Sequence, residues 1–220
     1  GDDYFTMELV DGPNIHELAL DVCDPRFFPV VGGVFRALAC LHARGLVHAD
    51  IKPANVLVKR DCLATNPADA AKLLDFGLAA DISDPGSAAA RGTFPYAAPE
   101  AYVSHVDARS DLYAMGVMLF ELATGRLPFG VKEPLAVIRQ QRVQALPDPR
   151  EIRPDLAAGL AELIVGLTDP EPNARLQSAD EALYAINEIA GTRFVVSQPG
   201  QTAFDLNGAL VGRKRDLQDL

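Results

Sequence analysis

A short polar segment, residues 48–55, carries three side chains that together could transfer a phosphoryl group to a hydroxyl. Asp50 could accept the proton of the attacking hydroxyl, Lys52 could neutralise charge on the transferred phosphate, and Asn55 could offer a neutral oxygen to a divalent cation. A second carboxylate, Asp75, lies further along the chain. Because Mg²⁺ prefers a few hard oxygen ligands completed by phosphate and water, Asn55 and Asp75 form a candidate Mg²⁺ site.

Four short motifs follow one another in this part of the chain. They are His-Ala-Asp-Ile-Lys-Pro-Ala-Asn at 48–55, Asp-Phe-Gly at 75–77, Gly-Thr at 92–93 and Ala-Pro-Glu at 98–100. Each is weak alone, because single polar residues usually lie on the surface and Asp-Phe-Gly also suits an ordinary turn. In this order and spacing they resemble the protein kinase family, and more narrowly its serine/threonine branch, in which the first motif is the catalytic loop.

The resemblance implies a role for individual residues. Asp50 would be the catalytic base and Lys52 the phosphate-contacting lysine, while Asn55 and Asp75 would hold Mg²⁺. Thr93 would hydrogen-bond Asp50 and Lys52 and help to shape the pocket for the acceptor residue. By the same resemblance, the cofactors would be ATP and Mg²⁺, and the partner would be a protein that presents a Ser or Thr hydroxyl.

The start of the chain resembles the segment that binds adenine. Residues 5–12 look like the hinge between the two kinase lobes, with Met7 at the gatekeeper position. Glu8 and Val10 would offer backbone groups to the base, and Leu57 would form the floor of the adenine site. We therefore expect ATP to bind between the hinge and the catalytic loop.

Two further matches concern support rather than chemistry. Asp111 opens the run 112–120, and a helix that is apolar on every side is normally buried. In the family this is the central helix, and its leading aspartate braces the catalytic loop. Arg175 lies in a segment that resembles the one whose arginine pairs with the glutamate of Ala-Pro-Glu, so we expect an ion pair with Glu100.

Two features depart from the family. Ala49 stands where most members have an arginine, so a phosphate on Ser83, Ser87 or Thr93 would lack its main cationic partner. Activity is therefore expected to be independent of phosphorylation at these three residues. Neither a glycine-rich loop nor a Val-Ala-x-Lys lysine precedes Tyr4, so we expect a piece of a longer protein that lacks the N-terminal lobe and is almost inactive alone.

Composition sets broad limits. With 220 residues, of which 49% are hydrophobic, the chain can bury one main core. A net charge of -10 argues against nucleic acid or an anionic membrane surface as a partner. Three cysteines without paired metal-ligand spacing predict reduced thiols, which is typical of a cytoplasmic protein. No apolar run is long enough to span a bilayer.

The expected fold class is α+β and mainly α. It would be a kinase-like C-terminal helical lobe with short β-hairpins at the active site and without an N-terminal lobe. Strands at 56–58 and 72–74 are expected to be joined by a polar, turn-rich loop. Apolar periodicity predicts helices at 28–44, 136–143, 156–167 and 179–190, the last capped by Ser178.

The domain organisation is expected to have three parts. Residues 1–190 would be a protein kinase domain, made of the hinge and C-terminal lobe and truncated at its N-terminus, and residues 191–208 a linker. Residues 209–220 resemble the entry to the ATPase domain of bacterial multidomain regulators. An amphipathic helix with a solvated basic cluster explains this last segment equally well.

Three functions remain open. The first is an active serine/threonine protein kinase of the bacterial type. The second is a pseudokinase that serves as a scaffold, although a binding module would not need Asp50, Lys52, Asn55 and Asp75 together. The third is a small-molecule phosphotransferase, a class that ordinarily lacks Ala-Pro-Glu and the segment around Thr93.

Overall fold

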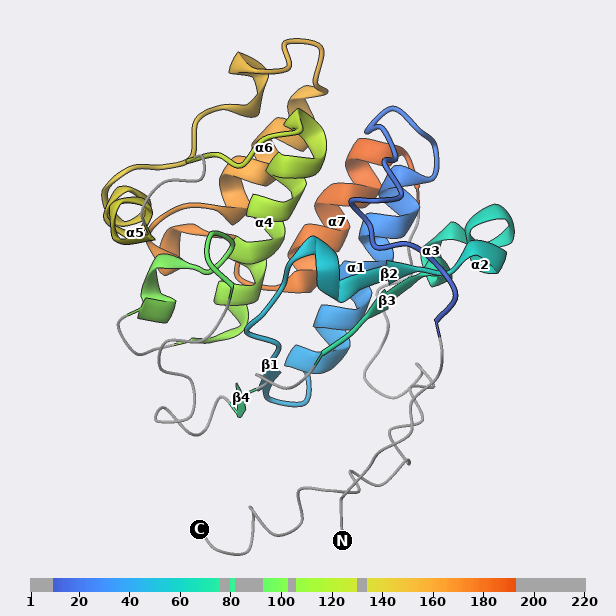
Figure 1. Cartoon of the computed structure of the whole chain (residues 1–220), viewed down its shortest axis with the longest axis horizontal. Coiled ribbons are helices and arrows are strands. Elements are labelled where there is room, and N and C mark those ends of the chain that lie inside the picture. The colour runs from blue at the N-terminus through green and yellow to red at the C-terminus, as the bar shows by residue number, and fades with distance from the viewer. Residues whose placement is uncertain (1–9, 76–79, 82–92, 103–105, 130–133, 193–220) are drawn as a thin grey trace, which may run out of the picture.

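The computed structural model forms a mainly helical body with two small pairs of antiparallel strands (Figure 1). Among the helices that it describes, none is both long and apolar enough to cross a membrane. The proposed linker and the candidate ATPase segment lie almost entirely outside the described residues. The structure describes residues 10–75, 80–81, 93–102, 106–129 and 134–192.

The helix α4, Ala108–Thr124, runs through the middle of the body (Figure 1). It begins with a capping box, in which the side chains of Asp107 and Ser110 bond to each other's backbone N–H groups. It ends at Gly125, whose φ of 70° lies in the left-handed region that glycine adopts without strain. Residues 110–120 are all buried, so the prediction of a buried central helix is confirmed.

Three further helices complete the core. The helix α1, Phe27–His42, packs against α7, Ala179–Ala190, and α4 packs against α6, Ala158–Leu167 (Figure 1). The contact between α4 and α6 is close at Gly116, where a Cβ atom would lie 2.4 Å from a methyl carbon of Thr168. Any larger residue at that position would push the two helices apart.

The strand prediction is confirmed in part. The strand β2, Val56–Val58, pairs antiparallel with β3, Ala71–Leu73, which begins one residue earlier than expected. The expected turn-rich loop between them is wrong, because the chain forms two helices there, α2, Arg60–Thr65, and α3, Pro67–Ala70. Contacts with α1 stabilise this connection, since the Arg36 guanidinium on α1 donates to the Ala68 carbonyl of α3 at 2.6 Å.

A second strand pair and a short backbone bridge flank the catalytic loop. The strand β1, Leu46–Val47, directly precedes the catalytic loop and pairs antiparallel with β4, Ala80–Asp81. On the other side, the Ile15 N–H donates to the Val56 carbonyl at 2.8 Å, which ties the start of the described chain to β2. Short strand pairs therefore lie on both sides of the loop, as expected.

The remaining elements are short or lie at the edge. The predicted helix 179–190 is confirmed in full as α7, and the Ser178 hydroxyl caps it by accepting from the Glu181 N–H at 3.2 Å. The bounds of α1, α5 and α6 differ from prediction by up to two residues, because helix ends carry the weakest sequence signals. The short or peripheral elements are η1 (Pro53–Asn55), η3 (Pro99–Tyr102), α5 (Pro134–Val143), η4 (Pro149–Glu151) and η5 (Pro172–Ala174).

Candidate active site

The first turn of α4 holds the start of the catalytic loop in place. The Asp111 carboxylate, which is 1% exposed, accepts from the backbone N–H of His48 at 2.8 Å and from that of Ala49 at 2.9 Å. The His42 ring at the end of α1 lies 2.8 Å from the same carboxylate. Ala49 has a φ of 64°, which is unfavourable for a residue with a Cβ, so these bonds hold a strained backbone. The predicted brace by Asp111 is confirmed.

The buried His48 ring connects the loop to the segment that leads to Asp75. Its Nε2 atom lies 2.9 Å from the Leu74 carbonyl oxygen, and its Nδ1 atom accepts from the Asp50 N–H at 3.3 Å. The Leu74 N–H also donates to the Asn55 carbonyl at 2.8 Å. The two segments are therefore joined by backbone bonds, and Asp75 follows directly, with a φ of 62°.

Asp50, Lys52 and Thr93 form a closed triangle of short hydrogen bonds. The Lys52 ammonium donates to Asp50 Oδ2 and to Thr93 Oγ1, each at 2.6 Å. The Thr93 hydroxyl donates to Asp50 Oδ1 at 2.6 Å, although the two residues are 43 positions apart. The Asn55 amide adds two further bonds to this cluster. Its Nδ2 atom donates to the Asp50 carbonyl at 2.8 Å and to Asp50 Oδ2 at 3.0 Å.

These bonds set the charge state of Asp50. Burial acts to raise the pKa of this carboxyl, but hydrogen bonds from Lys52, Thr93 and Asn55 favour the ionised form and outweigh burial. The net result is a pKa below the ordinary value of 3.8. Asp50 is therefore a carboxylate at neutral pH, able to accept a hydrogen bond or a proton.

A small pocket opens beside the triangle. Its wall includes Asp50 and Thr93 on one side, with Ala97 and Ala114 among the small apolar residues that complete it. Asp50 is only 5% exposed and yet borders this pocket, so its carboxylate is sheltered without being sealed inside the core. A second hydroxyl could approach the Asp50 carboxylate from this pocket.

The candidate metal ligands fit Mg²⁺ by their chemistry. The Asn55 nitrogen donates to Asp50, which leaves the amide oxygen as the atom that a cation would use. Asp75 is exposed and follows Leu74, whose N–H donates to the Asn55 carbonyl at 2.8 Å. One amide oxygen and one carboxylate, with positions left for phosphate and water, match the preference of this ion.

The predicted adenine site is only partly visible. Met7 and Glu8 lie outside the described residues. Val10 and Leu57 are both half-buried, and Leu57 forms a backbone bridge with Asn14 in the segment that follows Val10. The structure therefore brings the end of the predicted hinge beside β2, and the adenine contacts themselves stay a prediction.

The predicted ion pair between Glu100 and Arg175 is confirmed. The guanidinium donates to both carboxylate oxygens, at 2.6 Å and 2.8 Å, and its side chain is 0% exposed. It also donates to the carbonyls of Asp169, Pro170 and Arg109. Its carbon Cζ lies 4.8 Å from the centre of the Tyr113 ring. A bidentate, enclosed arginine of this kind fixes the segment that carries Glu100 against α4.

Sequence reasoning missed two contacts that hold the segment after Thr93. The Tyr96 hydroxyl donates to Glu121 Oε2 at 2.6 Å, and the Gln141 amide donates to the Pro95 carbonyl at 3.3 Å. A usable signal existed for Gln141, because it lies one helical turn after the buried Val137 and so shares an apolar face.

Comparisons with known proteins agree with this arrangement. The family model described as "Protein kinase domain" matches residues 2–185. The chain is 36% identical over 187 residues to a probable serine/threonine-protein kinase of Streptomyces coelicolor, and the match covers 81% of this chain and 27% of that protein. It is 36% identical over 188 residues to the serine/threonine-protein kinase PknB of Mycobacterium tuberculosis, covering 81% of this chain and 29% of PknB.

A third relative, the serine/threonine-protein kinase pkn2 of Myxococcus xanthus, is 33% identical over 227 residues, which cover 93% of this chain and 27% of pkn2. The chain thus spans less than a third of the length of each of these three relatives. The chain belongs to the protein kinase family.

Proposed function

We propose that this chain supplies the C-terminal lobe of a serine/threonine protein kinase, which transfers the γ-phosphate of ATP to a hydroxyl of a protein. The triangle of Asp50, Lys52 and Thr93 carries the proposal. Phosphoryl transfer needs a positioned hydroxyl, an acceptor for its proton and a cation near the phosphate oxygens, and this cluster offers all three functions in one place.

Asp50 is the proposed base that orients the acceptor and takes its proton. The Thr93 hydroxyl already donates to Asp50 Oδ1 at 2.6 Å, so the carboxylate geometry accommodates a hydroxyl donor. Since an ionised carboxylate offers about four lone-pair positions, a second hydroxyl can bond while Lys52 and Thr93 stay in place. The lowered pKa of Asp50 keeps it in the acceptor form at neutral pH.

Lys52 and the oxygen ligands are the proposed phosphate-side groups. Lys52 is 22% exposed, so its ammonium can reach a phosphate while it bonds Asp50 and Thr93. Asn55 and Asp75 would hold Mg²⁺, and when bound, ATP and Mg²⁺ would supply the phosphoryl group and neutralise charge on it. Val10 and Leu57, with Met7 and Glu8, are the proposed adenine contacts.

The domain limits belong to the same proposal. Residues 1–190 would form the hinge and C-terminal lobe, residues 191–208 a linker, and residues 209–220 the candidate start of an ATPase-type domain. The upstream part of the polypeptide would supply the N-terminal lobe, with the lysine and glycine-rich loop that cover the nucleotide in this family. Cytoplasmic location and a downstream regulatory domain are proposed with it. The acceptor class is taken from the serine/threonine-protein kinase names of the relatives.

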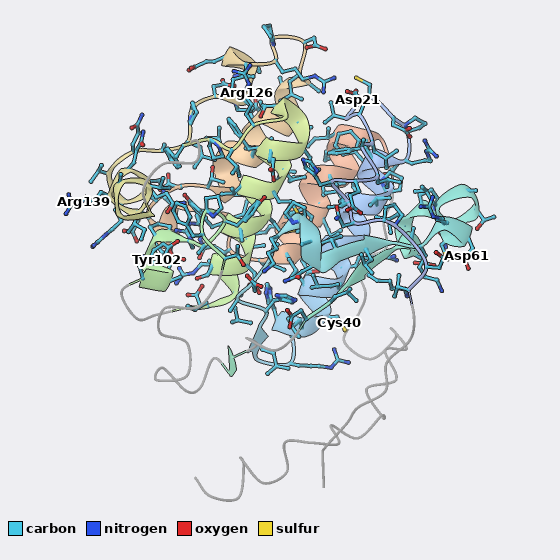
Figure 2. All side chains as sticks on the ribbon, viewed as in Figure 1. Asp21, Cys40, Asp61, Tyr102, Arg126 and Arg139 are labelled. Carbon is cyan, nitrogen blue, oxygen red and sulfur yellow. The ribbon has the colours of Figure 1, made fainter. Side chains whose placement is uncertain are left out.

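The test replaces Asp50 in the full-length polypeptide that contains this chain. We expect Asp50→Asn to lower kcat roughly 10²- to 10⁴-fold, because that is the usual contribution of a positioned general base. Transfer from radiolabelled ATP to a generic basic protein measures the rate. Asp61→Asn is the matched control, since Asp61 is an exposed carboxylate on α2 (Figure 2) and the rate should stay unchanged.

The other outcomes select among the alternatives. An unchanged rate in Asp50→Asn would exclude the role given to Asp50. Transfer to an aminoglycoside instead of the basic protein would identify a small-molecule phosphotransferase. Nucleotide binding without any transfer by the wild-type protein would identify a scaffold.

A further inference from the structure

A segment of four residues that begins at Thr93 is held at both ends. Residues 93–96, here called the acceptor segment, begin at Thr93, which bonds to Asp50 and Lys52 in the catalytic loop. They end at Tyr96, whose hydroxyl donates to Glu121 on α4 at 2.6 Å. The Tyr96 N–H also donates back to the Thr93 carbonyl at 2.9 Å, which closes the segment into a turn.

A third contact reaches the middle of the segment from another helix. The Gln141 amide on α5 donates to the Pro95 carbonyl at 3.3 Å, and the Gln141 residue is 0% exposed. The helix α5 also lies against η3, as Figure 2 shows at the labelled residues Tyr102 on η3 and Arg139 on α5. The acceptor segment is therefore bonded to the catalytic loop, to α4 and to α5.

Stability does not explain a glutamine at this buried position. Within the described part of the chain, the Gln141 Oε1 atom and the Tyr113 hydroxyl are both buried without a hydrogen-bond partner. A buried amide oxygen without a partner costs free energy, and an apolar side chain of equal length would avoid that cost. The nitrogen of the same amide donates to the Pro95 carbonyl, and the Gln141 side chain also interacts with the Tyr113 hydroxyl. The bond to Pro95 is the one that reaches the acceptor segment and that an apolar replacement would lose.

We propose that Gln141 is a positioning residue that fixes Pro95, and through it the acceptor segment, for the protein substrate. This inference rests on the proposed kinase function. Because Gln141 touches neither Asp50 nor Lys52 in the described contacts, it acts on the binding of the acceptor and not on the chemistry at the phosphate. Loss of Gln141 therefore raises the KM for the protein acceptor and leaves kcat and the KM for ATP unchanged.

The experiment compares two neighbouring glutamines of α5 in the full-length polypeptide. Gln141→Met keeps the length and removes the donor. Gln140→Met is the control, because the side-chain bond that the described residues show for Gln140 runs along the helix, to Gln144 at 3.3 Å. In Gln141→Met we expect the KM for a basic protein acceptor to rise about 3- to 10-fold, the usual effect of losing one neutral hydrogen bond. The kcat and the KM for ATP should change less than about twofold, and Gln140→Met should match the wild type.

Two further measurements separate positioning from a structural role. Gln141→Met should melt at about the same temperature as the wild type, because it removes a buried oxygen that lacks a partner but also leaves the Pro95 carbonyl without this donor. Gln141→His retains a ring N–H donor and should restore most of the acceptor KM. A lower Tm together with a lower kcat would overturn the proposal, as would an unchanged acceptor KM in an active Gln141→Met protein.

Hydrogen exchange tests the tether, which is the hydrogen bond from the Gln141 amide to the Pro95 carbonyl, without any need for turnover. The Tyr96 amide, which bonds to the Thr93 carbonyl, should exchange faster in Gln141→Met than in the wild type and in Gln140→Met. If the wild-type protein transfers no phosphate, the proposed function fails while this exchange measurement still decides the tether. Equal exchange in all three proteins would overturn the tether.

Discussion

Two ion pairs in this molecule use similar groups in opposite ways. Lys52 and Asp50 lie 2.6 Å apart at the edge of a pocket, with the lysine 22% exposed. Arg175 and Glu100 also lie 2.6 Å apart, but the arginine is 0% exposed. The distance between the charges is the same, so it is the surroundings of the cation that distinguish the two pairs.

The difference lies in unused bonding capacity. An ammonium has three donors, and within the described residues Lys52 gives bonds to Asp50 and Thr93. Arg175 bonds both oxygens of Glu100 and three backbone carbonyls, and a guanidinium has five N–H donors. A pair that must receive a ligand keeps a donor and a path to solvent, whereas a pair that holds two segments together uses every donor inside the protein.

The largest expected effect comes from breaking the enclosed pair. Arg175→Met should lower the free energy of unfolding by about 3–5 kcal/mol, because removing one partner leaves the Glu100 carboxylate without its cation. Chemical denaturation measures the change. Arg150→Met is the control, since the pair of Arg150 with Asp148 is exposed and should not matter measurably. Equal midpoints for Arg175→Met and the wild type would contradict the structural role of this pair.

A smaller effect is expected when the open cluster loses one hydroxyl. Thr93→Val keeps the shape of the side chain but removes the bonds to Asp50 and Lys52. We expect kcat/KM for the protein acceptor to fall roughly tenfold, equivalent to about 1.4 kcal/mol. Thr93→Ser, which keeps the hydroxyl, should retain most of the rate. If Thr93→Val instead destabilised the fold as strongly as Arg175→Met, the contrast between the two pairs would not hold.

The smallest expected effect concerns pH. The pKa of Asp50 lies below its ordinary value of 3.8, so the folded state favours the ionised carboxylate. The resulting stability is fully present above 3.8 and is lost as the pH falls through the lower pKa of the folded protein. Denaturation midpoints of the wild type and Asp50→Asn should therefore differ by a constant amount between about pH 5 and about pH 7. The difference should shrink only in stronger acid, and shrinkage near neutral pH would refute the lowered pKa.

Much of this fold could be predicted because its signals are local. The helix α7 was predicted to the residue, since an apolar stripe follows the capping serine Ser178 and ends before Gly191. The brace by Asp111 and the pair of Glu100 with Arg175 were predicted from the kinase resemblance. In each case a charged residue borders a recognisable motif, so its partner could be named before any coordinates were known.

The connection between β2 and β3 shows where local signals fail. Its polar, turn-rich composition predicted a loop, yet α2 and α3 form there. Arg36 on α1 bonds to Ala68 and Asp69 of α3, and α2 packs against α3. A short helix gains most of its stability from packing, so its sequence alone gives little warning. Contacts with a distant helix therefore override the local preference.

The residue types and their order along the chain were enough to specify a phosphoryl-transfer motif, the helices that frame it and the identity of its charged groups. The bond between Thr93 and Asp50 was expected from the kinase resemblance, whereas only the tertiary structure placed Gln141 against Pro95. The physical reason is that such contacts join segments more than forty positions apart, and their distances depend on how α4 and α5 pack rather than on any local pattern.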